Sequence, residues 1–354
     1  MKSQQLTGVT MLRGIAVLML VAHHTLEASL GASVGPRSSA WLTRISESGV
    51  DILFVISGFM MLFRSFAPGR EVTKPGRFLS RRLARVYLFY WVCCAAFVAI
   101  WSVGFLKSRD LTIINVVDSL LLIPSSQTLI GPSWILSYLV YFYLIFGASL
   151  VLRSRDAAVI CSTLAIVVLL ALGLLMPNGE ARDFFAKPIA LEFGFGLLLA
   201  RAFLTGHVDL APIWSLLGFA ALALAPPLVL HPDETGLLGL PRVMVWGLPA
   251  VLLLAAFLRL GPPKTFAVRF GVLLGHASYA LYLTHFFVMI FYEKLLKDSP
   301  IGRHSQIAIV PAVIALCVIV GLLAYFVIER PLVCGFLRSL GPPQGRDVRS
   351  TASQ

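Results

Sequence analysis

The segment LRGIAVLMLVAHHT, residues 12–25, combines an uninterrupted apolar run with ionisable residues at both ends. Arg13 lies before the run, and His23 and His24 lie after it. About 20 apolar residues let a helix cross a bilayer, and ionisable groups inside such a helix are costly and usually functional. The segment therefore predicts a membrane-spanning helix that carries polar groups at two depths.

Similar apolar runs recur as far as Ile328 in a chain of 354 residues that is 58% hydrophobic and only 13% charged. Soluble domains are nearer half apolar and a quarter charged. The first run is no signal peptide, because it lacks a small-residue cleavage site and further runs follow it. The pattern predicts an all-α integral membrane protein with about ten transmembrane helices, at approximately 10–30, 50–66, 86–106, 134–152, 157–176, 186–204, 212–230, 242–260, 272–292 and 306–328. The segment 111–126 carries Asp118 and Pro124, which predicts an interfacial or re-entrant piece.

The basic residues indicate the orientation. With the N-terminus in the cytoplasm, 19 of the 29 lysines and arginines fall on the cytoplasmic side, as the positive-inside rule requires. An even number of spans places the C-terminus in the cytoplasm too. The net charge of +12 is thereby explained by topology, so no nucleic-acid partner is expected. We expect one transmembrane domain over residues 1–335 and a polar, disordered cytoplasmic tail over residues 336–354.

Helical geometry separates the two histidines. Eleven residues from Arg13 to His24 make three turns plus about 20°, so both side chains share a face, about 16 Å apart along the axis. His23 lies about 80° from that face, and we interpret it as structural. One interpretation is that Arg13 and His24 line a polar channel. The alternative is that Arg13 anchors the helix at the membrane interface and His24 is a structural histidine inside the helix bundle. Glu27, three residues after His24, could orient or charge the imidazole.

Four further motifs accompany the Arg-x10-His spacing. They are GVDILFVISGFMM from Gly49, RRLARVYLFYW at 81–91, PSWILSYLVYFYLIFG at 132–147 and LGHASYALYLTHFFV at 274–288. In this order and spacing they resemble the membrane-bound acyltransferase 3 family over residues 8–335, in particular its exopolysaccharide-production members.

The resemblance implies an O-acyltransferase of the inner (plasma) membrane. It implies acyl-CoA, with acetyl-CoA as the expected donor, no permanently bound cofactor, and an acceptor hydroxyl on a sugar of a polysaccharide or glycolipid. Membrane lipid and polysaccharide-assembly proteins are expected partners. A transporter or flippase for a lipid-linked sugar, or a scaffold of an export machine, would share the polytopic architecture but would consume no acyl donor.

Sugar O-acylation needs a general base, and neutral histidine, with an ordinary pKa near 6.5, suits this role. We predict His24 as that base. Asp51 is either its orienting carboxylate or a cap of the second span. Donor phosphates are expected to bind the planar guanidinium groups of arginines. The alternative for the arginines of the motif at 81–91 is that they only set the membrane topology. The expected donor-binding residues are Arg13, Arg81, Arg82 and Arg85.

Residues that contact the acceptor are expected in two places. One is an aromatic stripe on the fourth predicted span, at 134–152, and the other is the polar face of the ninth, at 272–292. Packing is the alternative for the stripe, and a structural role is the alternative for the ninth-span histidine. With Glu27 added, the expected acceptor-binding residues are Glu27, Trp134, Tyr138, Tyr141, Tyr282 and His285. Leu139 replaces the glutamate of the family motif, so only another acid such as Glu192 could do that work. The cysteines lack metal-ligand spacing, and no metal site is expected.

Overall fold

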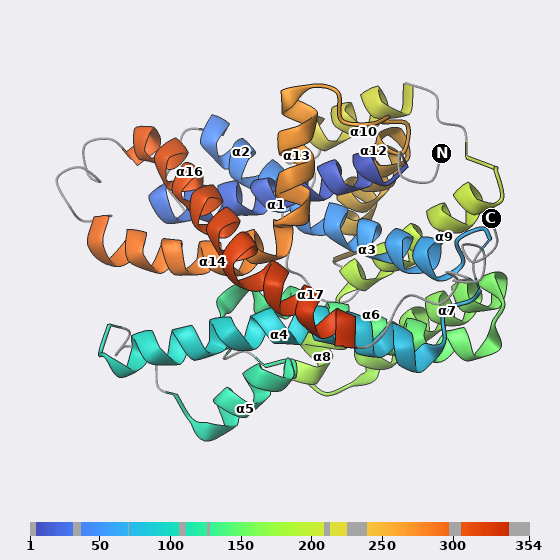
Figure 1. Cartoon of the computed structure of the whole chain (residues 1–354), viewed down its shortest axis with the longest axis horizontal. Helices are drawn as coiled ribbons and strands as arrows, with labels where there is room; N and C mark the ends of the chain where they lie inside the picture. Colours follow the sequence, from blue (N-terminus) through green and yellow to red (C-terminus); the bar gives the residue numbers. More distant parts are fainter. Residues whose placement is uncertain are drawn as a thin grey trace, which may run out of the picture.

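The computed structural model describes residues 5–30, 37–69, 71–105, 111–125, 128–208, 213–224, 239–296 and 306–339. Every regular element within these ranges is a helix, which confirms the all-α prediction (Figure 1). The predicted tail at 336–354 lies largely outside the described residues, because the last described helix ends at Ser339.

Helices of 14 or more residues form most of the molecule. They are α1 (Gln5–Leu30), α3 (Gly49–Ser65), α4 (Pro75–Ser102), α6 (Trp134–Ser149), α7 (Arg155–Leu175), α9 (Leu191–Leu204), α14 (Ser278–Phe291) and α16 (Gln306–Ala324). The shorter α-helices are α2 (Arg37–Glu47), α5 (Ile113–Leu121), α8 (Glu180–Phe185), α10 (Ile213–Leu224), α11 (Leu240–Arg242), α12 (Leu248–Phe257), α13 (Phe266–His276) and α17 (Arg330–Ser339).

Single turns of tighter or wider helix join several of these elements. The 3-10 turns are Gly131–Ser133, Leu150–Leu152 and Pro188–Ala190, and the π segments are Val243–Gly247, Tyr292–Leu296 and Tyr325–Glu329.

Seven helical stretches of the described residues are long and apolar enough to cross a membrane, or eight if the bent pair α13–α14 counts as one span. The spans predicted at 186–204 and 212–230 contain the shorter helices α9 and α10, of 14 and 12 residues. These helices fit a multi-pass membrane protein, whereas the count of ten and the cytoplasmic termini stay predictions. Helix α5 has nine residues, too few to cross a bilayer, as expected for 111–126.

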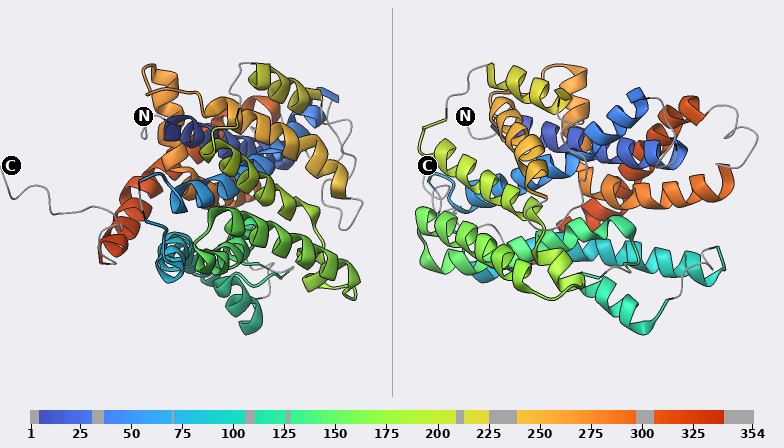
Figure 2. Two further views of the ribbon diagram at one scale, coloured as in Figure 1. Left: turned by 90° about the vertical axis from the view of Figure 1, so that its right-hand side faces the viewer. Right: turned by 180° about the vertical axis from the view of Figure 1, so that it is seen from behind.

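The helices form two layers. Helices α1, α3, α12, α13 and α14 lie in one layer and α4 to α8 in the other, with α16 and α17 crossing from the first toward the second (Figures 1 and 2). Phenylalanines join the layers where α3, α6 and α9 meet. The ring of Phe142 stacks on Phe193 at 4.2 Å between centroids and meets Phe54 edge-on at 5.6 Å.

Two glycines permit a close helix contact between α3 and α9. A Cβ atom at Gly58 would overlap the backbone carbonyl of Phe193, and one at Gly196 would overlap that of Val55. Small residues at such crossings let two backbones touch, which is how membrane helices gain packing energy without a hydrophobic driving force. This contact positions α3, which carries Asp51 and Arg64.

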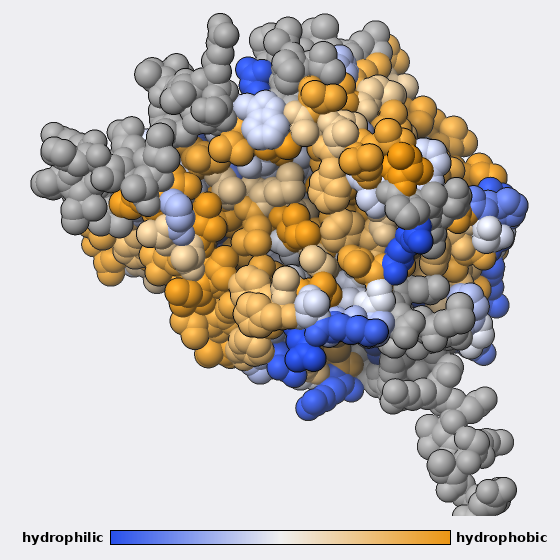
Figure 3. Space-filling view, turned by 90° about the horizontal axis from the view of Figure 1, so that it is seen from above, coloured by the Kyte–Doolittle hydropathy of each residue, from blue (hydrophilic) through white to orange (hydrophobic). Residues whose placement is uncertain are grey.

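The outer surface is apolar. Large hydrophobic side chains of α7 and α16 are exposed, among them Ile160, Leu164, Leu316 and Leu323. Figure 3 shows hydrophobic residues over most of one face, with hydrophilic residues confined to small areas. An exposed apolar surface this extensive fits contact with lipid.

The span predicted at 272–292 is broken. Helices α13 and α14 meet at Ala277 with a bend of 75°. Side chains from other helices satisfy the backbone groups that the break leaves open. Arg13 donates to the carbonyl of Gly275, and Glu329 accepts from the N–H of Ala280 at 3.0 Å.

Candidate functional site

A cavity of about 920 Å³, including its open mouth, lies between α1, α3, α4, α6 and α14. Four arginines line it: Arg13, Arg64, Arg82 and Arg85. They come from the first half of α1, the end of α3 and the first turns of α4, and they lie near enough to repel one another. One end of the cavity is therefore strongly cationic and suits an anion such as a phosphate.

The arginine cluster agrees only partly with the predicted set. Arg13, Arg82 and Arg85 line the cavity, whereas Arg81 does not, and donor binding by these residues stays a prediction. Helix α4 begins eleven residues before the predicted start of the third span, because Pro75 at its first turn favours helix initiation there. The arginines consequently lie within the helix, where Arg81 and Arg82 project in different directions. Arg64 was missed, although its place at the end of an apolar run was a usable signal.

Arg13 has two tasks. Its Nε donates to the carbonyl oxygen of Gly275 at 2.8 Å, and its Nη2 donates to the same oxygen. This carbonyl belongs to the last turn of α13, where carbonyl oxygens have no N–H partner within the helix. A positive charge at this end therefore stabilises the helix. The side chain also faces the cavity. Arg13 thus holds the α13–α14 break in place beside the cationic end.

The opposite end of the cavity is aromatic and apolar. Phe54 on α3 precedes Arg64 by ten residues, so the cavity follows the helix for about 15 Å. Tyr282 lines this end and donates its hydroxyl to the carbonyl of Pro132. Leu139 also faces the cavity, so no carboxylate is present at that position. Glu192 does not line the cavity.

His24 does not line the cavity but lies just beyond its aromatic end. Its ring stacks on that of His285, with centroids 5.3 Å apart and planes inclined by 17°. The His285 ring in turn lies 6.0 Å from that of Tyr282. His285 is 1% exposed, whereas the His24 side chain is 36% exposed. Tyr282, His285 and His24 therefore form a continuous row from the cavity to an accessible imidazole.

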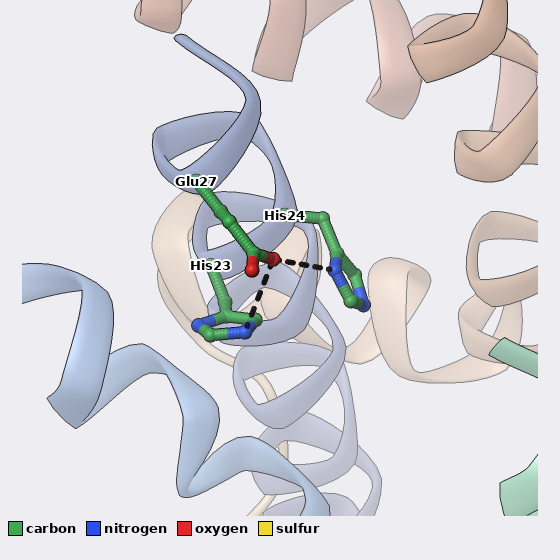
Figure 4. A group of neighbouring side chains, drawn as sticks. All are labelled: His23, His24 and Glu27. Atoms are coloured by element: carbon green, nitrogen blue, oxygen red, sulfur yellow. Dashed lines mark ion pairs between the residues drawn. The ribbon is translucent and has the colours of Figure 1, made fainter. Parts of the chain in front are cut away.

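Glu27 lies between the two neighbouring histidines of α1. Its carboxylate is 3.8 Å from Nδ1 of His24 and 3.8 Å from Nε2 of His23, with both rings directed at it (Figure 4). His23 also contacts α2, where its Nδ1 lies 2.9 Å from the carbonyl oxygen of Thr43. Glu27, rather than Asp51, is accordingly the carboxylate that faces His24.

Asp51 takes part in a buried charge cluster at the start of α3. Its two oxygens accept from Nε and Nη2 of Arg242 at 3.2 and 3.1 Å. Glu47 accepts from Nη1 of Arg242 at 2.6 Å. Glu192, fully buried, is near enough to interact with Asp51 and Arg242. Sequence reasoning missed Arg242, although an arginine at the start of an apolar run was a visible signal.

The aromatic stripe of α6 is largely used for packing. Tyr138 is buried, with its ring stacked on Phe184 at 4.2 Å, and Tyr141 meets Phe184 edge-on at 5.7 Å. Trp134 is half-buried and carries the Lys187 ammonium 5.8 Å from its ring centroid. The structure does not bring these three residues to the cavity or to His24.

Comparison with known proteins gives two matches in sequence. Residues 6–327 match the family model Acyl_transf_3, described as an acyltransferase domain. The chain is also 29% identical over 304 residues to the exopolysaccharide production protein ExoZ of Rhizobium meliloti (strain 1021), which covers 82% of this chain and 90% of that protein. No solved structure matches the chain.

Proposed function

Since the chain belongs to the acyltransferase 3 family, we propose that it transfers an acetyl group from acetyl-CoA to a sugar hydroxyl of an exported polysaccharide or glycolipid. The similarity to an exopolysaccharide production protein supports this class of acceptor. The cell inner membrane, with both termini in the cytoplasm, is the proposed location, because it places the cationic end of the cavity on the side where acyl-CoA is made.

The four-arginine cavity is the observation that carries the proposal. Guanidinium groups bind phosphate oxygens through paired hydrogen bonds, and Arg64, Arg82 and Arg85 gather at one end of a long cavity. The remaining length is apolar and aromatic, which suits the thin pantetheine arm of coenzyme A. Phosphates bound at the arginines would leave the thioester pointing toward Tyr282 and His285.

His24 is the proposed general base. Glu27 faces Nδ1 of His24, which favours the tautomer with the proton on Nδ1 and the lone pair on Nε2. In the proposed step, Nε2 takes the proton of the acceptor hydroxyl as its oxygen bonds to the thioester carbonyl carbon. The C–S bond then breaks, and the departing thiolate receives that proton from the imidazolium. No acyl-enzyme forms, and the products are the O-acyl sugar and free coenzyme A.

The two substrates approach from opposite sides. The donor approaches His24 from the cavity, on the side of Tyr282 and His285. The acceptor reaches the exposed edge of His24 near Glu27. Stacking against His285 limits the rotation of the His24 ring, so His285 is proposed as a positioning residue rather than a proton carrier.

The proposal is tested by acetyl-CoA binding to the purified protein with Arg82→Ala. Loss of a charge-assisted hydrogen bond costs about 1.5–3 kcal/mol, so Kd should rise by about 10- to 100-fold. Arg269→Ala is the matched control, since Arg269 is exposed and bonds only locally, to Pro263, among the contacts shown. Equal acetyl-CoA affinities of the two variants would show that the arginine cluster does not bind the donor and only sets the membrane topology.

A further inference from the structure

His23, His24 and Glu27 form a compact group of metal-type donors at the accessible end of α1. One donor atom from each residue lies within 4.8 Å of the other two. All three come from about one turn of a single helix, and Glu27 is 52% exposed, so the group is open to ions from solvent (Figure 4).

The hydrogen bond of His23 fixes its tautomer. A carbonyl oxygen only accepts, so Nδ1 of His23 must carry the hydrogen that it donates to Thr43. In the neutral ring, Nε2 then bears a lone pair, and this lone pair faces a carboxylate oxygen of Glu27 at 3.8 Å. Two electron-rich atoms that face each other favour a cation between them.

Metal-binding histidines have this same arrangement. One ring nitrogen donates to a backbone carbonyl or carboxylate, which orients the other toward the ion. Two imidazoles with one carboxylate are the donor set of open three-ligand zinc sites. Zinc bonds of about 2.0–2.1 Å in tetrahedral geometry place neighbouring ligand atoms about 3.3 Å apart. The two separations of 3.8 Å from Glu27 exceed this value by about 0.5 Å, and the two histidine nitrogens lie within 4.8 Å of each other. Small side-chain rotations on one helical turn would bring all three atoms to an ion.

We propose that Nε2 of His23, Nδ1 of His24 and the carboxylate of Glu27 bind a divalent transition-metal ion of the Zn²⁺ type, and that the bound ion inhibits acyl transfer. The inhibitory part rests on the proposed function. An ion on Nδ1 of His24 moves the ring proton to Nε2, the nitrogen that must accept the hydroxyl proton. It also withdraws Glu27 from its orienting position.

The binding test uses the purified full-length protein with Zn²⁺ alone, and with Co²⁺ as a spectroscopic probe. We expect Co²⁺ to give the absorption of a tetrahedral nitrogen and oxygen site without thiolate bands, which separates this group from the exposed Cys161 and Cys334. His23→Asn keeps a donor for Thr43 but removes the Nε2 ligand. It should weaken Zn²⁺ binding at least about 10-fold, as should Glu27→Gln.

His207→Asn is the matched control, because His207 is exposed and lies outside the group. It should bind Zn²⁺ as the unmodified protein does. Equal Zn²⁺ affinity of His23→Asn and His207→Asn would overturn the site.

Inhibition is measured as the ratio of each variant's acetyl transfer with Zn²⁺ to its own transfer in EDTA. The unmodified protein should lose activity in Zn²⁺ and regain it in EDTA, and His23→Asn should need at least about 10-fold more Zn²⁺ for the same loss. Specific Zn²⁺ binding with unchanged or increased activity would overturn the inhibitory role. A protein that binds Zn²⁺ at this group yet transfers no acyl group in EDTA would contradict the proposed function while supporting the site.

Discussion

Arg242 illustrates at the residue scale how a membrane protein carries buried charge. Its guanidinium contacts Asp51 through two hydrogen bonds and Glu47 through one, and its Cζ lies 4.9 Å from the ring centroid of Trp246. Buried ions are tolerated when every charge has a partner in good geometry. This cluster joins the start of α3 to the segment before α12, and thereby fixes the end of α3 opposite Arg64.

Arg242→Met should destabilise the protein by about 3–5 kcal/mol, because it leaves the buried carboxylate of Asp51 without its cation. Thermal unfolding in detergent should show a clearly lower midpoint. Arg338→Met removes an exposed arginine of α17 and should leave the midpoint nearly unchanged. Equal midpoints for the two variants would show that Asp51 does not depend on Arg242.

His285 is tested at the same scale by exchanging its ring. His285→Phe keeps an aromatic ring against His24 but no titratable group, whereas His285→Ala removes the stack. If His285 positions His24, the Phe variant should retain several-fold more acetyl transfer than the Ala variant at saturating donor. Equal loss of acetyl transfer in the Phe and Ala variants would indicate that the His285 imidazole itself transfers the proton.

At the scale of elements, helical periodicity predicted the faces of α1 correctly. Arg13 and His24 both contact the α13–α14 pair, through Gly275 and His285, whereas His23 contacts α2. A local repeat of 3.6 residues is sufficient for such an inference. The hydropathy pattern likewise located the apolar helices, including the short α5.

Contacts between distant segments could not be predicted from local patterns. The Asp51–Arg242 pair joins residues 191 positions apart, and no spacing rule connects them. The bend at Ala277 was also missed, because the groups that stabilise it are Arg13 and Glu329, which belong to other helices. The partner of Asp51 and the bend at Ala277 thus depend on tertiary contacts, which local sequence patterns do not contain.

Gly196→Ala tests the contact between α3 and α9. The added methyl would overlap the Val55 carbonyl, and overpacking of this kind costs about 1–3 kcal/mol. Gly335→Ala is the matched control in α17, where an added Cβ meets nothing within 4 Å and alanine favours the helix. Thermal unfolding should show a lower midpoint for the first variant only, and equal midpoints would contradict a tight α3–α9 crossing.

At the scale of the whole molecule, the two ends of α1 have different chemistry. Arg13, in the first half of α1, lies at the cationic end of the cavity. His24 and Glu27 lie near the other, solvent-accessible end of α1, about 16 Å further along the helix axis. Helices α1 and α3 run in opposite directions, so the end of α3 brings Arg64 to the same end as Arg13 (Figure 1). Under the proposed function, the donor and the acceptor would therefore approach from opposite ends of α1.

This arrangement requires a defined topology. We expect a reporter fused to the C-terminus to be active on the cytoplasmic side, because an even number of spans returns the chain there. The same reporter after Arg64, in the loop that precedes α4, should also be cytoplasmic. An extracytoplasmic C-terminus would contradict the ten-span count, and an extracytoplasmic Arg64 loop would place the cationic end on the wrong side for acyl-CoA.

The most direct test of the central claim is the O-acetyl content of exported polysaccharide and glycolipid from cells that carry His24→Ala. His207→Ala, measured at matched membrane level, is the control for expression and insertion. General-base catalysis contributes about 10²- to 10⁴-fold, so His24→Ala should lower the rate of O-acetylation at least about 100-fold while His207→Ala retains it. Full O-acetylation by a normally inserted His24→Ala protein would contradict the assignment of His24 as the base.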